Sequence, residues 1–129
     1  MFHPLRRAGT RLAVALGVAA LALAAAPAAP AGAHATLIGT SPTADEVLDA
    51  VPDQVEMRFD EPVETVDEAV RVFGPDGERV DAGEAELTEG DATLVAAVEG
   101  DQQGTYTVAW RVTSEDSHTL NASFVFHVG

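Results

Sequence analysis

The sequence contains no cysteine among its 129 residues, and its seven basic residues are all arginines. Without cysteine the chain can form neither disulfide bonds nor thiolate metal sites, which excludes zinc-finger and iron–sulfur chemistry. All 21 acidic residues lie in residues 34–129, where only four arginines accompany them. This charge excludes a nucleic-acid-binding protein, because phosphates would be repelled. It fits a solvated acidic surface, adaptation to salt, or attraction of cations.

Long hydrophobic runs are also missing, except for one near the start of the chain. Residues 12–26 are apolar, three arginines precede them, and a proline- and alanine-rich stretch ends in Ala31-Gly32-Ala33. A basic start, an apolar centre and a small-residue A-x-A end are typical of a secretory signal peptide. The apolar run is shorter than the ~20 residues that span a bilayer, so an uncleaved anchor is the weaker alternative. We therefore expect residues 1–33 to be a signal peptide cleaved after Ala33.

The expected mature protein is one small domain, residues 34–129. The continuation of Arg6-Arg7 by Ala8-Gly9-Thr10 fits a twin-arginine signal poorly, so the general secretory route is favoured. No second apolar segment follows, and we expect a monomer with no membrane anchor after cleavage. Its expected location is the periplasm or the extracytoplasmic cell envelope.

Apolar and polar residues alternate along several segments of this domain, which is the period of a half-buried strand. In residues 105–113, for example, Tyr106, Val108, Trp110 and Val112 share one face, which predicts that they belong to the core. Short strands separated by turn formers predict an all-β, antiparallel sandwich or Greek-key barrel of immunoglobulin-like type. Residues 47–52 are expected to form a short helical turn or irregular chain. Strands are predicted at residues 36–39, 54–60, 69–73, 93–98, 105–113 and 123–128, with weaker segments around Val80 and Leu87.

Two short segments carry potential metal ligands. Cleavage after Ala33 would give His34 a free α-amine beside its imidazole, and these two groups can chelate one metal ion. Far along the chain, Asp116-Ser117-His118 supplies a carboxylate and a second imidazole, which project to the same side if their backbone is extended. Nitrogen donors with a carboxylate suit Cu(II). Taken alone, a histidine directly after a cleavage site can occur by chance, and Asp116 can be an ordinary acidic residue in a surface turn.

The mature chain resembles the periplasmic copper-binding CopC family along nearly all its length. The resemblance rests on several motifs in the same order. They are His34-Ala35-Thr36-Leu37, Ser41-Pro42, Val51-Pro52, Phe59-Asp60-Glu61-Pro62-Val63, the stretch from Gly104 to Val112, Ser114-Glu115-Asp116-Ser117-His118, and Phe124-Val125-Phe126.

The resemblance implies a seven-stranded Greek-key β-barrel of cupredoxin-like appearance that binds one Cu(II) per chain. The implied ligands are the amine and imidazole of His34, the carboxylate of Asp116 and the imidazole of His118. Glu61 matches a carboxylate that supports the N-terminal amine in the family, although an ordinary exposed acid is an equal alternative. His127 is a weak candidate for an extra metal contact. Ser117 departs from the family's glycine, and it would be strained if the position requires positive φ; Ala122 is a second departure.

Methionine is scarce, which bears on Cu(I). Some CopC-like proteins carry a methionine-rich segment, because soft thioethers select Cu(I). Here Met1 leaves with the signal and Met57 is in phase with core residues, so we expect no dedicated Cu(I) site.

We expect the protein to hold copper for resistance, buffering or delivery to an inner-membrane copper importer of the CopD type, and not to be an enzyme. Two alternatives stay open. A histidine-brace redox enzyme of the polysaccharide monooxygenase type also uses an N-terminal histidine, but Asp116 would occupy one of its coordination positions. An immunoglobulin-like adhesion module would need no His34 at the N-terminus.

Overall fold

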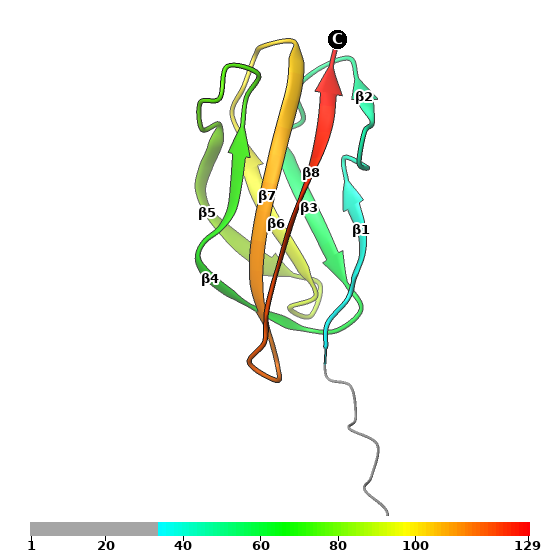
Figure 1. Cartoon of the computed structure of the whole chain (residues 1–129), viewed down its shortest axis with the longest axis vertical. Coiled ribbons are helices and arrows are strands. Elements are labelled where there is room, and N and C mark those ends of the chain that lie inside the picture. The colour runs from blue at the N-terminus through cyan, green and yellow to red at the C-terminus, as the bar shows by residue number, and fades with distance from the viewer. Residues whose placement is uncertain (1–33) are drawn as a thin grey trace, which may run out of the picture. The chain divides into compact units, whose positions relative to one another are not determined.

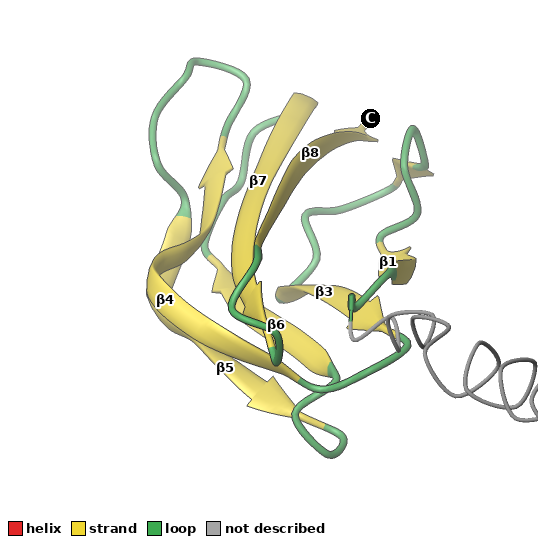
Figure 2. Ribbon diagram, turned by 60° about the horizontal axis from the view of Figure 1, so that its bottom comes forward, coloured by secondary structure: helices red, strands yellow, loops and turns green. Residues whose placement is uncertain are grey.

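The computed structural model of the chain describes residues 34–129, and the expected signal peptide lies outside the described residues. Two four-stranded sheets with the orders β1-β3-β6-β5 and β2-β8-β7-β4 face each other (Figures 1 and 2). Among residues 34–129, no helix is long and apolar enough to cross a membrane. The strands are β1 (Leu37–Ser41), β2 (Val47–Leu48), β3 (Gln54–Phe59), β4 (Val63–Phe73), β5 (Asp81–Thr88), β6 (Thr93–Val98), β7 (Gly104–Ser114) and β8 (Thr119–Val128).

The all-β sandwich predicted from the sequence is confirmed, with eight strands in place of seven. The additional strand is β2, which was expected to be a helical turn or irregular chain. It pairs with the end of β8 in parallel, through Val47 and His127, whereas the other pairings are antiparallel. Only β5–β6 and β7–β8 are neighbours in both sequence and sheet. The remaining connections cross between the sheets.

Alternating apolar residues of both sheets fill the space between them. Val55 and Met57 of β3 and Val108 of β7 are all fully buried. The rings of Phe59 and Trp110 meet edge to face, with centroids 5.3 Å apart, so that this aromatic pair joins the two sheets. The prediction that Tyr106 and Trp110 belong to the core is confirmed, since they are 1% and 6% exposed.

β4 and β8 begin at least four residues before the strands that the sequence pattern predicted. β4 begins at Val63, but its register against β7 shifts between Thr65 and Val70, and Glu68 has a φ of 54°. This irregularity breaks the alternation that marks a strand. β8 begins at Thr119, where residues 119–123 are mostly exposed and therefore carry little apolar signal.

One end of the sandwich brings together the start of the described chain and the turn between β7 and β8. This end lies opposite the C-terminus (Figure 1). β1 pairs with β3 there, with Leu37 opposite Phe59. The segment before β1 is thereby placed beside the end of β7, which positions the candidate site.

Candidate metal centre

The arm formed by residues 34–36 is tied to the β3–β4 connection. The N–H group of Thr36 donates to Oδ1 of Asp60 at 2.6 Å, and the N–H group of Asp60 donates to the carbonyl of Thr36 at 3.0 Å. Ala35 is 5% exposed and packs with the core. The arm is therefore fixed just beyond His34, whose own side chain remains 59% exposed.

The turn between β7 and β8 presents Asp116 and His118. Two backbone hydrogen bonds close it, from Ser114 N–H to the His118 carbonyl at 2.8 Å and from Ser117 N–H to the Ser114 carbonyl at 2.9 Å. The condition of an extended backbone at residues 116–118 is therefore not met, and a tight turn brings the two side chains together instead. Ser117 has a φ of 68°. The left-handed conformation that would favour glycine is thus present at this position.

The arm and the turn bring His34, Asp116 and His118 into one cluster. Nδ1 of His34 lies 3.0 Å from Oδ2 of Asp116, and Nδ1 of His118 lies 2.9 Å from the same oxygen. The two imidazole rings have centroids 4.8 Å apart. Within residues 34–129, this is the one group of at least three potential metal-binding side chains whose ligand atoms lie within 4.8 Å of one another.

Hydrogen bonds keep Asp116 ionised. The hydroxyl of Ser114 donates to Oδ1 of Asp116, and the side chain and backbone N–H of His118 add further contacts. Together these contacts hold the pKa of the Asp116 carboxyl far below its usual range, against a smaller opposing effect of burial. The cluster therefore offers an anionic oxygen between two imidazole nitrogens.

The donor set fits a first-row divalent metal ion. Two ligands that are each about 2 Å from a metal and adjacent around it lie ~3 Å apart, which matches both nitrogen–oxygen separations. Imidazole and carboxylate donors without thiolates suit Cu(II), which such sites hold most tightly among these ions.

Two other residues singled out from the sequence lie outside this cluster. Glu61 is half-buried, and within the described residues its neighbour Asp60 is the carboxylate bonded to the arm. A supporting role for Glu61 stays a prediction. His127 pairs with Thr105 near the start of β7, at the end of the strand away from Ser114, and its Nδ1 contacts the Thr105 hydroxyl at 2.9 Å. Sequence reasoning missed Ser114 and Asp60, whose contacts depend on the fold.

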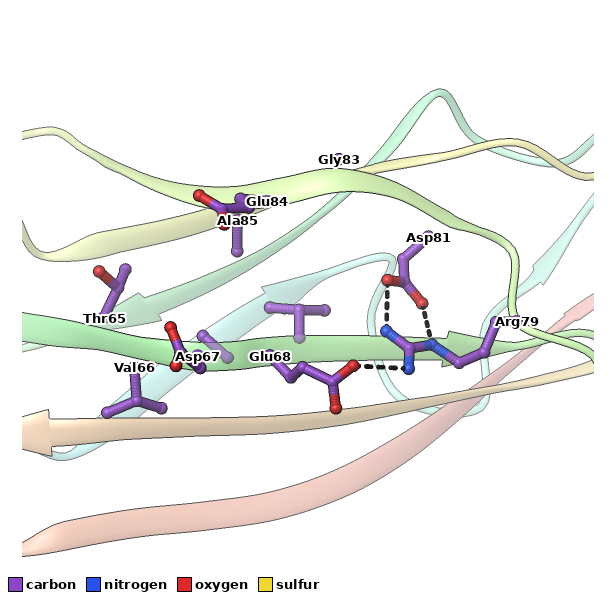
Figure 3. Close-up of a pocket in the computed structure, with 11 residues that line it drawn as sticks. Thr65, Val66, Asp67, Glu68, Arg79, Asp81, Gly83, Glu84 and Ala85 are labelled. Carbon is purple, nitrogen blue, oxygen red and sulfur yellow. Dashed lines mark hydrogen bonds and ion pairs between the residues drawn. The ribbon is translucent and has the colours of Figure 1, made fainter.

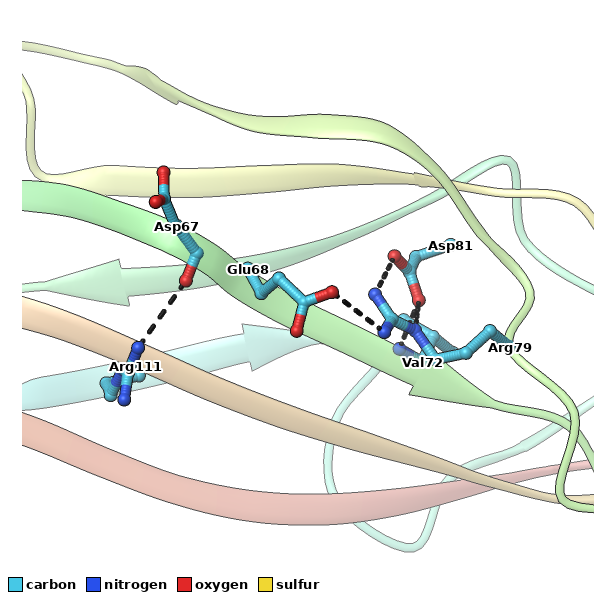
Figure 4. A network of polar contacts seen from close by, with 6 residues as sticks. All are labelled: Asp67, Glu68, Val72, Arg79, Asp81 and Arg111. Atoms are coloured by element: carbon cyan, nitrogen blue, oxygen red, sulfur yellow. Dashed lines mark hydrogen bonds and ion pairs between the residues drawn. The ribbon is translucent and has the colours of Figure 1, made fainter.

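A hollow that does not include the cluster lies between the edges of β4 and β5 (Figure 3). Its cation, Arg79, binds Asp81 through two hydrogen bonds of 2.7 and 2.8 Å and also contacts Glu68 at 3.3 Å. Oδ1 of Asp81 further accepts the N–H of Val72 at 2.8 Å (Figure 4). Arg79 is thus engaged on both sides, and the network links the two sheets at this edge.

The fold and the cluster define a small β-sandwich domain with a histidine–carboxylate site at one end. Residues 37–129 match the CopC domain. The chain belongs to the CopC family, as the sequence motifs indicated. His34 lies just before the matched range.

Two curated proteins are similar to about three quarters of this chain. The chain is 33% identical to protein YobA of Escherichia coli K12 over 98 residues, which cover 74% of this chain and 79% of that protein. It is 29% identical to the copper transport protein CutJ of Bacillus subtilis over 99 residues, or 75% of this chain. The match spans only 18% of the length of CutJ.

Solved structures show the same fold. The CopC structure from Methylosinus trichosporium OB3b has a TM-score of 0.60 and 27% identity, and covers 74% of this chain and 93% of that one. PcoC of Escherichia coli, described as a methionine-rich copper resistance protein, has a TM-score of 0.61 and 25% identity, and covers 74% and 99%. This chain differs in having two methionines, of which Met57 is fully buried in the core.

Proposed function

We propose that this protein is an exported copper-binding protein that holds one Cu(II) per chain. The ligands are the α-amine and imidazole of His34, the carboxylate of Asp116 and the imidazole of His118. The single observation that carries the proposal is the convergence of two imidazole nitrogens on one oxygen of Asp116. Membership of the CopC family and the copper-related names of its members support the choice of metal.

The α-amine completes the donor set after cleavage following Ala33. Nδ1 is the ring nitrogen closer to the backbone, and it is the atom of His34 that faces Asp116. An amine and Nδ1 of one residue can therefore bind the same ion as a chelate. Amine, two imidazoles and a carboxylate give four donors, which suits tetragonal Cu(II). Residues 1–33 act in this scheme as the signal peptide, and residues 34–129 as the copper-binding domain.

The function is to hold and pass on copper in the periplasm or extracytoplasmic envelope, as a monomer and not as an enzyme. Four protein donors favour storage of the ion over chemistry at an open position. Both histidine side chains are more than half exposed, so a partner can reach the ion directly. An inner-membrane importer of the CopD type is the partner that the family resemblance suggests.

Mass spectrometry of the exported, purified protein with and without Cu(II) tests this proposal. We expect a mature chain that starts at His34 and gains the mass of one copper ion. A mature chain that starts elsewhere, or a protein that takes up no Cu(II), would contradict the proposal. A copper-loaded protein that oxidises a polysaccharide would favour the redox-enzyme alternative.

A further inference from the structure

The hydroxyl of Ser114 contacts Oδ1 of Asp116, the carboxylate oxygen that is not in contact with the two imidazole rings. We propose that Ser114 is a positioning residue of the metal site, which restricts Asp116 to binding the metal through Oδ2 alone. This inference rests on the proposed function and concerns a residue outside its donor set.

The position of Ser114 is fixed by the fold. It is the last residue of β7 and only 1% exposed, and its backbone N–H donates to the carbonyl of His118 at 2.8 Å. Its hydroxyl has one proton and two possible acceptors, Oδ1 of Asp116 and the His118 carbonyl at 3.2 Å. An ionised carboxylate is a stronger acceptor than a backbone carbonyl, so the proton is donated to Asp116.

The two oxygens of Asp116 therefore have different roles. Oδ1 accepts hydrogen bonds from the Ser114 hydroxyl and from the backbone N–H of His118 at 3.3 Å. Oδ2 faces Nδ1 of His34 and Nδ1 of His118. With Oδ1 held on the protein side, only Oδ2 is free to bind a metal ion, and the plane of the carboxylate is set before the ion arrives.

Removal of the hydroxyl would release this constraint. The Asp116 side chain, which is 23% exposed, would then be able to rotate toward solvent or to offer both oxygens to the ion. Partners that orient a metal ligand typically change affinity by about 10–100-fold when they are mutated. A one-oxygen carboxylate suits the small coordination number of Cu(II), whereas two-oxygen binding is typical of Ca²⁺.

The experiment compares Cu(II) binding by the purified mature protein and three variants, using a competing chelator and electron paramagnetic resonance. Ser114→Ala removes the hydroxyl, and we expect Kd to rise by about tenfold or more, with a changed copper spectrum. Ser114→Thr keeps a hydroxyl and should retain the original spectrum. Val108→Ala is the control for stability, because this fully buried residue lies six positions earlier on β7, about 20 Å away.

The outcomes separate the two proposals. A wild-type protein that does not bind Cu(II) contradicts the proposed function. A wild-type protein that binds, together with a Ser114→Ala variant of unchanged Kd and spectrum, overturns the role of Ser114 alone. So does a Val108→Ala variant that loses as much affinity as Ser114→Ala.

A second measurement needs no variant. Infrared spectra of wild-type protein labelled with ¹³C at the aspartate carboxyl report how a carboxylate binds, through the separation of its symmetric and antisymmetric stretches. On addition of Cu(II), we expect one carboxylate to show the wide separation of one-oxygen binding. The narrow separation of two-oxygen binding would overturn the proposal.

Discussion

Nδ1 of His34 lies 3.0 Å from Oδ2 of Asp116, although the two residues come from opposite ends of the described chain. The contact depends on the pairing of β1 with β3 and on the turn that closes β7 and β8. Neither His34 alone nor the Asp116–His118 turn alone supplies the complete donor set. Metal binding at this site therefore requires the folded protein.

The first prediction distinguishes the roles of two neighbouring carboxylates, Asp60 and Glu61. Asp60 binds the N–H of Thr36 at 2.6 Å, so Asp60→Ala should loosen the arm that carries His34. We expect a loss of about 1–2 kcal/mol in the free energy of unfolding and a Kd for Cu(II) about tenfold higher.

Glu61→Ala is the matched variant. If Glu61 supports the amine as the family resemblance implies, it should weaken Cu(II) binding without the loss of stability. Chemical unfolding of the metal-free proteins and chelator competition measure the two effects. Unchanged affinity in Asp60→Ala would show that the arm needs no anchor.

The second prediction concerns pH. The pKa of Asp116 is held far below its usual range by Ser114 and His118. The contribution of its ionised form to stability is therefore present above the unfolded pKa of ~3.9 and is lost only as the pH falls through the lower folded value. Release of Cu(II) in mild acid must then come from protonation of the nitrogen donors. We expect log Kd to rise by about one unit per pH unit for each proton taken up, as the pH falls below the reference pKa of ~8 of an α-amine. Chelator competition at several pH values measures this slope, and a Kd independent of pH would contradict the nitrogen donors.

The third prediction concerns the strained position in the turn. Ser117 has a φ of 68°, a conformation that costs a residue with a Cβ about 1–2 kcal/mol. Glycine loses about 0.5–1 kcal/mol through its freedom in the unfolded chain, so Ser117→Gly should stabilise the protein by about 0.5–1 kcal/mol. In a domain of this size, Tm should rise by about 2–6 °C. Ser123→Gly, within β8, should instead lower Tm. A lower Tm for Ser117→Gly would show that the serine side chain stabilises the turn.

The fourth prediction concerns the edge between β4 and β5. Burial tends to raise the pKa of Asp81, but its hydrogen bonds to Arg79 and Val72 outweigh this and lower it. The resulting stability is present above the unfolded pKa and is lost as the pH falls through the folded pKa, below about pH 4. Asp81→Asn should cost about 1–2 kcal/mol at pH 7 and less at pH 3. Exposed Asp49→Asn controls for the change in net charge. Thermal unfolding at both pH values measures the difference, and an equal loss at both would contradict the ionic contribution.

The sequence pattern predicted the buried strands best, because their alternation reflects burial directly. β6 was predicted at its observed bounds, and β7 to within one residue at each end. The first half of β4 escaped prediction because of its irregular register. The two-residue β2 has no pattern of its own and forms only because β8 lies beside it.

The sequence indicated which residues form the cluster, whose role as metal ligands stays a prediction, but it did not indicate the residues that hold the cluster in place. The motifs shared with the CopC family identified His34, Asp116 and His118, which the fold brings into contact. Ser114 and Asp60 have common side chains. Ser114 matters because it is buried, and Asp60 matters because the pairing of β1 with β3 brings it to the N–H of Thr36. The backbone conformation of the β7–β8 turn was not predicted either. The glycine that the family has at the position of Ser117 did indicate a positive φ there.

The most direct test of the central claim is the affinity for Cu(II) of the mature protein with and without one alanine added before His34. The addition leaves all three side chains in place but moves the α-amine away from the imidazole of His34. Linked donors bind roughly 10²–10⁴-fold more tightly than separate ones. We therefore predict that the added alanine raises the Kd for Cu(II) at least about 100-fold. An unchanged Kd would contradict the account, because Cu(II) would then be held without the N-terminal amine.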